Sequence, residues 1–429
     1  MRLFTRAAPL AAPLAATLLA ATALAGTARA ADLRISCYSD GVECDVTTDL
    51  AKRFTAANPD IHITVDKVAY KVITESLPVQ LAAGNGPDIA RVTDFGAISK
   101  YFLDMRPLLP DAPYWEANFG QTLPWMQNGP NDHGIYGLPT QLTITGPIVN
   151  KTLFEQAGVP MPGPQATWDD WAAATRKVAA ATKTEFGLAM DRSGHRFATG
   201  AISYGAKYFG ADGTPAPVDD GFKAFASRWV GWNKDGSAEK EVWAAAGGAA
   251  YRDAFEDFAN GRVVAYVSGS WQVSRLQTSI GDGFEWVIAP PFCGPAACTP
   301  MPGGASFVAF KSGKSPKEAA RFLDYLASEP VYREMMARTA NIPAHQGLQK
   351  AGVQYDDAAP RVAAALGEFT KAANSLSPVA YRLQGYILNR PIFNATVARL
   401  SQSIVGELTL DQAYTRIDSD VQSALAAAK

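Results

Sequence analysis

One large aromatic side chain, Trp271, stands directly after a predicted strand and a turn of small residues. The apolar stretch Val263 to Val267 leads into Ser268-Gly269-Ser270, and the indole follows. Because glycine lacks a Cβ atom, we expect Gly269 to let the backbone approach a bound molecule closely. The indole would then offer a flat wall, and aromatic rings stack on the apolar C–H faces of sugars. Packing of Trp271 inside the core is the alternative.

Polar side chains also follow two other predicted strands. The strand Leu33 to Cys37 leads into Tyr38-Ser39-Asp40, and the strand after Pro87-Asp88 leads into Thr93-Asp94-Phe95. Ligands of parallel sheets bind beyond the carboxyl ends of the strands. These two turns are therefore the places to inspect for ligand-binding residues.

The stretch Asp191 to Arg196, with the sequence DRSGHR, concentrates charged and polar residues. Two interpretations stay open: a solvated loop, or additional contacts to a ligand. If Arg192 or Arg196 enters the site, a negatively charged ligand is favoured, because arginine binds carboxylate and phosphate through two hydrogen bonds.

Known catalytic and metal-binding patterns do not emerge from the sequence. The four histidines show no H-E-x-x-H spacing, and no G-x-S-x-G elbow occurs. Gly84-Asn85-Gly86 precedes a predicted strand, so we interpret it as a turn and not as a dinucleotide loop. A carboxylate pair for glycoside hydrolysis stays open, but among 41 acidic residues a chance pair carries little weight. We expect no catalytic residue, no metal and no cofactor.

The first 30 residues have the pattern of a secretory signal peptide. Arg2 and Arg6 precede an apolar Ala/Leu-rich segment, and Ala28-Arg29-Ala30 provides a cleavage site. A membrane anchor is the alternative. Removal of residues 1–30 would leave 36 basic against 41 acidic residues, a net charge of −5. Nucleic-acid binding is therefore not expected, because phosphate binding needs a basic face.

The four cysteines form two close pairs, Cys37 with Cys44 and Cys293 with Cys298. An even number in an exported chain predicts two disulfides, each of which closes a short loop. Zinc is the alternative, but neither pair has C-x2-C spacing.

The order of predicted elements indicates an α/β fold. Strands near residues 33–37, 61–65 and 89–92 alternate with helical patterns, which implies a parallel sheet with helices on its faces. A chain of 429 residues exceeds what one core usually serves, so we expect two lobes. Thr167 with Asp170, and Ser315 with Glu318, predict capping boxes at two helix starts.

Six motifs in order resemble the extracellular solute-binding proteins of family 1, the sugar-binding components of bacterial ABC importers. They are LAKRFTAANPDIHITVD, LAAGNGPDIARVTD, GIYGLPTQLTITGPIVNKTLFEQAGV, TWDDW, FANGRVVAYVSGSW and GGASFVAFKSGKSPKEAARFLDYLASEP. The resemblance covers most of residues 33–345 and weakens after about 350. It implies a periplasmic-binding-protein-like fold with two lobes, each with a mainly parallel sheet flanked by helices, joined by crossing strands.

The resemblance also implies the lobe boundaries and the crossings. Residues 31–143 and 290–340 would form the N-terminal lobe, and 144–289 and 341–429 the C-terminal lobe. The chain would cross near Leu142 to Ile144. Thr143 departs from the pattern, because some members have an acidic residue there. With Asp191 and Arg196 added from the polar stretch, the expected ligand-binding residues are Tyr38, Asp40, Asp94, Gln141, Thr143, Asp191, Arg196, Trp271, Gly303, Gly304 and Tyr381.

The function implied is the capture of a mono- or oligosaccharide in the periplasm by a monomer that delivers it to the membrane permease of an ABC transporter. A binding protein for a phosphorylated polyol or another anionic sugar derivative is one alternative. An exported enzyme that acts on glycans is another.

Overall fold

The computed structural model describes Met1 and residues 30–427, apart from 130, 245–247 and 356–358. The predicted signal segment falls almost wholly on residues 2–29, which lie outside the described residues. In the described part of the chain, no helix combines the length and the apolar character that crossing a bilayer requires.

The first half of the fold is built on three parallel strands. β1 (Ala31–Cys37) pairs with β2 (Ile61–Lys67) on one side and with β3 (Ile89–Val92) on the other. The chain passes between them through α1 (Glu43–Ala57) and then through a π-helical turn, η1 (Val72–Ser76), which continues into α2 (Leu77–Ala82). The strand–helix–strand order predicted from the sequence is confirmed.

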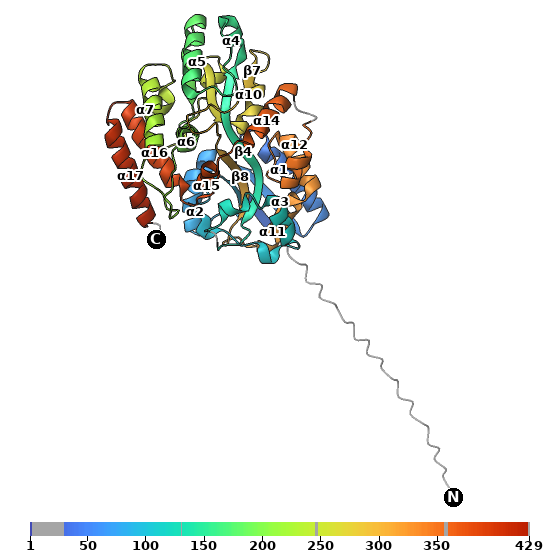
Figure 1. Ribbon diagram of the computed structural model, residues 1–429. Helices are drawn as coiled ribbons and strands as arrows, with labels where there is room; N and C mark the ends of the chain where they lie inside the picture. Colours follow the sequence, from blue (N-terminus) through green and yellow to red (C-terminus); the bar gives the residue numbers. More distant parts are fainter. Residues whose placement is uncertain (2–29, 130, 245–247, 356–358, 428–429) are drawn as a thin grey trace.

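One long strand joins the two halves. β4 (Gly137–Asn150) is buried along all 14 residues. Its residues up to Ile144 pair antiparallel with β8 (Pro302–Ala309), and from Thr145 onwards it pairs with β6 (Val263–Gly269). The change of partner occurs next to the crossing predicted at Leu142 to Ile144. In Figure 1, β4 runs from the half that contains α3 and α11 to the half that contains α4 and α5.

The complete strand order is β2-β1-β3-β8-β4-β6-β5, with β7 paired to β4. β5 (Phe186–Met190) runs parallel to β6, whereas β7 (Trp286–Ile288) runs antiparallel to β4. Both halves therefore combine parallel strands with the antiparallel strands that connect them. This α/β architecture agrees with the expected fold class.

Helices cover both halves of the sheet (Figure 1). Around β1–β3 and β8 the further helices are α3 (Ala112–Phe119), α11 (Pro316–Ala327), α12 (Glu329–Thr339) and α13 (Gln346–Ala351), with short turns η2 (Ser99–Tyr101), η3 (Arg106–Leu108) and η4 (Leu123–Met126). Around β5–β7 they are α4 (Lys151–Ala157), α5 (Trp168–Thr182), α6 (Gly194–Ser203), α7 (Asp220–Lys234), α8 (Glu241–Ala244), α9 (Phe255–Ala259), α10 (Val273–Ile280), α14 (Pro360–Ala373), α16 (Asn389–Ile404) and α17 (Leu410–Ala427). α15 (Pro378–Gly385) contacts both groups.

The segment just after residue 340 packs on the first half. The ring of His345 lies 5.2 Å from that of Phe119, and α13 contacts α3. The chain returns to the second half only with α14, which packs on β4 and β7.

Only one of the two predicted capping boxes forms. At the start of α5, the backbone N–H of Asp170 donates to Thr167 Oγ1 over 3.1 Å, and that of Thr167 donates to the Asp170 carboxylate over 2.9 Å. The prediction for Ser315 is wrong, because its side chain caps nothing. The start of α11 is held by a tertiary contact instead, from the backbone N–H of Lys314 to Asp88.

The cysteines lie in the pairs expected from the sequence, with their sulfur atoms at bonding distance. The Cα atoms are 5.7 Å apart for Cys37 and Cys44, and 4.0 Å apart for Cys293 and Cys298. The first pair joins the end of β1 to α1 and so encloses the turn that contains Tyr38 and Asp40.

Candidate functional site: a cavity between the two halves

A cavity of about 380 Å³ lies between the two halves of the molecule. The first half contributes the ends of β1 and β3, and the second contributes the start of α6, the turn after β6 and the start of α16. β4 and β8 line it where they pair. Eight of the eleven predicted site residues line this cavity: Tyr38, Asp40, Gln141, Thr143, Arg196, Trp271, Gly303 and Gly304.

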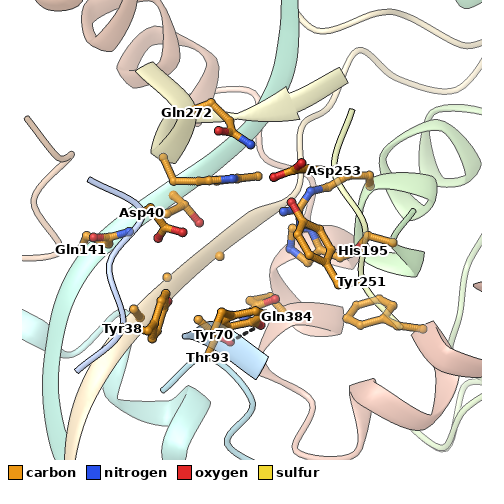
Figure 2. A pocket seen from close by; sticks show the side chains of 18 of the residues that line it. Tyr38, Asp40, Tyr70, Thr93, Gln141, His195, Tyr251, Asp253, Gln272 and Gln384 are labelled. Carbon is orange, nitrogen blue, oxygen red and sulfur yellow. Dashed lines mark hydrogen bonds between the residues drawn. The ribbon is translucent and has the colours of Figure 1, made fainter. Parts of the chain in front are cut away.

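Two tyrosines of the first half form an aromatic wall. The rings of Tyr38 and Tyr70 are 4.9 Å apart, and the Tyr70 hydroxyl lies 2.8 Å from Thr93 Oγ1. Figure 2 shows this group facing Gln272 across the cavity. Tyr70 was missed by the sequence analysis. It comes shortly after β2, so the rule that was applied to the ends of the first and third strands would have found it.

The turn η5 (Ser270–Gln272) brings Trp271 to the cavity, where its side chain is half-buried. The role predicted for Gly269, to let the backbone approach a ligand closely, is wrong. A Cβ atom at Gly269 would lie 1.9 Å from Cζ3 of the indole, so the glycine leaves room for the tryptophan ring and not for a ligand. The guanidinium carbon of Arg196 lies 4.1 Å from the centre of the indole, which is close enough for a cation–π contact.

The polar stretch Asp191 to Arg196 is not a solvated loop. Asp191 is fully buried and Arg192 is 2% exposed. Arg192 points away from the cavity and donates to the carbonyl of Ala250 over 2.9 Å. Only Arg196 of the two arginines lines the cavity.

Asp191 does not line the cavity but lies behind it. Its carboxylate accepts hydrogen bonds from the hydroxyls of Tyr251 (3.0 Å) and Ser268 (2.7 Å), and lies 3.5 Å from Nε of Arg196. Burial raises the pKa of Asp191, and the nearby Arg196 opposes that shift. Asp191 therefore supports cavity residues and does not face a ligand itself.

His195 lines the cavity and connects the second half to β8. Its Nε2 lies 2.8 Å from the carbonyl oxygen of Pro302, and Nη1 of Arg196 lies 3.0 Å from its Nδ1. These contacts define a neutral ring that donates from Nε2 and accepts at Nδ1. Burial, reinforced by the positive charge of Arg196, lowers the pKa of His195 to about 3.

All three arginines that line the cavity have a carboxylate partner. Arg196 lies next to Asp191, Arg275 is 3.0 Å from Asp253, and Arg390 is 3.0 Å from Asp94.

Gln272, Arg275, Asn389 and Arg390 were not predicted. Gln272 follows Trp271 on η5 and Arg275 lies on α10 directly after it, so both could have been found from their place in the sequence, whereas nothing local marks the two residues that begin α16.

Two further predicted residues, Asp94 and Tyr381, also lie outside the lining. Asp94 turns to Arg390, so it is a partner of a cavity residue. Tyr381 packs on Trp125, with 5.5 Å between the ring centres, and its hydroxyl donates to the carbonyl of Gln121. α15 is docked against η4, and this docking directs the tyrosine away from the cavity.

Among the described residues, no group of three or more His, Cys, Asp and Glu side chains is arranged to hold a metal ion. Two α/β halves around a polar and aromatic cavity define a ligand-binding protein of the periplasmic-binding type. The chain belongs to the bacterial extracellular solute-binding proteins, whose family model matches residues 45–332.

Known proteins show the same relationship. The chain is 25% identical over 318 residues to the multiple sugar-binding protein of Streptococcus mutans. This alignment covers 68% of this chain and 71% of that protein. Its fold is similar to that of maltose-bound MalE3 of T. maritima, with a TM-score of 0.74 at 19% identity, covering 92% of this chain and 100% of that one. An ABC substrate-binding protein of Listeria monocytogenes in complex with cycloalternan also has a TM-score of 0.74, at 18% identity, covering 92% and 99%.

Proposed function

We propose that this chain captures an uncharged carbohydrate in the cavity between its halves and delivers it to the membrane permease of an ABC importer. The observation that carries the proposal is that aromatic rings and hydrogen-bonding groups line one cavity. Tyr38, Tyr70 and Trp271 provide the rings, while Asp40 and Gln141 provide polar groups. A sugar needs both, because its C–H faces are apolar and its hydroxyls need partners. The relatives named for sugar binding support the same ligand class.

The charges in the cavity favour a neutral sugar over a phosphorylated polyol or another anion. An anion needs arginines with uncompensated charge. Here Arg196, Arg275 and Arg390 each lie within 3.5 Å of a carboxylate. Their remaining N–H groups can donate to sugar hydroxyls, but binding an anion would place it close to three carboxylates.

We propose that the sugar leaves unchanged, so the protein is not an exported glycan-active enzyme. Membership of a family of binding proteins supports this. Incubation with each sugar, followed by chromatography, tests it: recovery of the intact sugar is expected, and new products would overturn the proposal.

Closure of the two halves around the sugar is the proposed mechanism. β4 is the element about which they would turn, since it pairs with β8 on one side and β6 on the other. Asp94 and Arg390 meet from opposite halves. A ligand that contacts both halves only when they are closed shifts the population to the closed state.

We further propose a periplasmic location, with the signal peptide of residues 1–30 removed, a monomeric state and disulfides Cys37–Cys44 and Cys293–Cys298. The N-terminal lobe would hold residues 31–143 and 290–340, and the C-terminal lobe 144–289 and 341–429. The packing of α13 on α3 favours moving the last boundary past residue 351.

A thermal-shift screen tests the ligand class. Mono- and oligosaccharides, including maltose, lactose, raffinose and D-tagatose, are compared with glycerol 3-phosphate and sulfate. A binding sugar raises the melting temperature through mass action. Native mass spectrometry of the freshly purified protein adds the mass of any sugar that co-purifies. No response to any sugar, or a response to the anions alone, would overturn the proposal.

A further inference from the structure

Arg91 is a buried charged residue directly beneath the cavity. It lies on β3, its side chain is 1% exposed, and it is not among the residues that line the cavity. Burial of a guanidinium is costly unless hydrogen bonds and opposite charges compensate it. Its contacts therefore indicate what the residue does.

The guanidinium holds two predicted ligand-binding residues by hydrogen bonds. Nη1 donates to the backbone carbonyl of Tyr38 over 2.9 Å, and Nη2 donates to Oε1 of Gln141 over 2.9 Å. Cζ also lies 4.2 Å from the centre of the Tyr38 ring. Because Gln141 is on β4 and Tyr38 follows β1, one side chain fixes two walls of the cavity relative to each other.

Two carboxylates face the same guanidinium. Asp40 lies 3.6 Å from Nη1, and Glu43 lies 3.8 Å from Nη2. Glu43 in turn accepts hydrogen bonds from the backbone N–H groups of Asp40 (3.1 Å) and Gly41 (2.8 Å). The turn that carries Asp40 is thus held by Glu43, and Arg91 balances the negative charge of both acids.

We propose that Arg91 is a positioning residue for the sugar: it aligns Tyr38, Asp40 and Gln141 and supplies the positive charge against which Asp40 stays a carboxylate. This role rests on the proposed function, because it requires that these three residues contact the sugar. Arg91 itself lies behind them.

The protonation of Asp40 supports this role. Burial raises the pKa of Asp40 to about 6, and the positive charge of Arg91 opposes this shift most strongly. The negative charge of Glu43 raises the pKa of Asp40 further, whereas Arg196 lowers it. Tyr38, whose own pKa is raised by burial, also faces this group. Removal of Arg91 leaves Asp40 and Glu43 together without their nearest cation, so Asp40 would hold a proton at neutral pH and would lose the stronger, charge-assisted hydrogen bonds that a carboxylate accepts from sugar hydroxyls.

Arg91→Met, Arg91→Lys and Asp40→Asn test the proposal by calorimetry with maltose, lactose and raffinose between about pH 5.5 and 8.5. In the unaltered protein, affinity should fall as the pH drops through about 6. Arg91→Met should move that midpoint upwards: a shift of about one pH unit would lower affinity at pH 7 about twofold, and a shift of about two units would lower it about tenfold. Arg91→Lys should keep the midpoint but lose affinity at every pH, because lysine lacks the planar fork that reaches Tyr38 and Gln141. Asp40→Asn should flatten the profile.

Melting of the sugar-free protein provides a second measurement. Arg91→Met should be destabilised more at pH 8 than at pH 5.5, and adding Asp40→Asn should restore part of the loss at pH 8. If Arg91→Met does not fold, the pH profiles of sugar affinity for Arg91→Lys and Asp40→Asn decide whether Arg91 positions the site.

The outcomes are separable. If the unaltered protein binds a sugar and the Arg91 variants keep both its affinity and its pH midpoint, Arg91 has no positioning role. A loss of stability with an unchanged affinity and midpoint would make it a purely structural residue. If the unaltered protein binds no sugar at any pH, the carbohydrate proposal fails, and the role of Arg91 fails with it.

Discussion

The guanidinium carbon of Arg196 lies 4.1 Å from the centre of the Trp271 indole. The same guanidinium lies 3.0 Å from Nδ1 of His195 and 3.5 Å from the Asp191 carboxylate. The aromatic surface expected from the sequence is thus shared with a cation that is held from behind. A sugar that stacks on Trp271 would also meet the N–H groups of Arg196, so one contact provides both an apolar face and hydrogen-bond donors.

Loss of the indole tests its place in the site. We expect Trp271→Ala to weaken binding of the best sugar in the screen by roughly 1.5 to 4 kcal/mol, because a buried aromatic contact is removed. Calorimetry measures it, with Trp271→Phe as the variant that keeps a ring. An affinity equal to that of the unaltered protein would place Trp271 outside the site.

Replacement of Gly269 tests whether this position leaves room for the indole or for the ligand. Gly269→Ala would put a Cβ atom 1.9 Å from the indole and so displace the ring. Its effect on affinity should approach that of Trp271→Ala, and the double variant should be no weaker than Trp271→Ala alone. Additive losses would mean that Gly269 acts on the ligand directly.

The Asp94–Arg390 pair should favour the closed form. Asp94→Asn removes one charge of a partly buried pair that joins the halves, so sugar affinity should fall by about 1 kcal/mol and the sugar-free protein should become more extended. Calorimetry and small-angle X-ray scattering measure the two effects. Asp420→Asn is the matched control, because it breaks a pair with Arg399 that lies within one half. Equal effects of both variants would contradict the prediction.

His195 should make the protein acid-sensitive. Its folded-state pKa of about 3 lies below the usual value of 6.5, so the unfolded chain binds the proton more readily. The contribution of neutral His195 to the free energy of unfolding is complete above about pH 6.5. It is lost as the pH falls towards 3, by about 1.4 kcal/mol per pH unit. Denaturant unfolding at pH 7 and pH 5 should therefore show a smaller difference for His195→Gln than for the unaltered protein. The same difference in both would rule out this residue as the cause.

The predicted Cys37–Cys44 disulfide should stabilise the turn that carries Tyr38 and Asp40. Its short loop corresponds to roughly 2 kcal/mol in the chain-entropy estimate. Replacement of both cysteines by serine should lower the unfolding free energy by about that amount and also weaken sugar binding. Alkylation of the denatured protein should modify no thiol before reduction and four after it, if both pairs are oxidised. Modification without reduction would contradict the pairing.

Local sequence patterns determined where the strands end and which side chains follow them. Tyr38, Asp40 and Trp271 could be predicted because an apolar strand followed by a turn is a short-range signal, and ligands bind at strand ends. The crossing on β4 and both cysteine pairs were also predicted, from the family resemblance and from close spacing. These features depend on residues near one another in the chain.

The tertiary structure decided which side chains meet across the cavity. Arg390 reaches it from α16, 296 positions after Asp94, and its position depends on how that helix packs. Asp191 was expected to contact the ligand but lies behind Arg196. Arg91 has no local sign of its role, since a charged residue in a strand is normally exposed. Long-range packing sets the direction of each side chain, and no short segment contains that information.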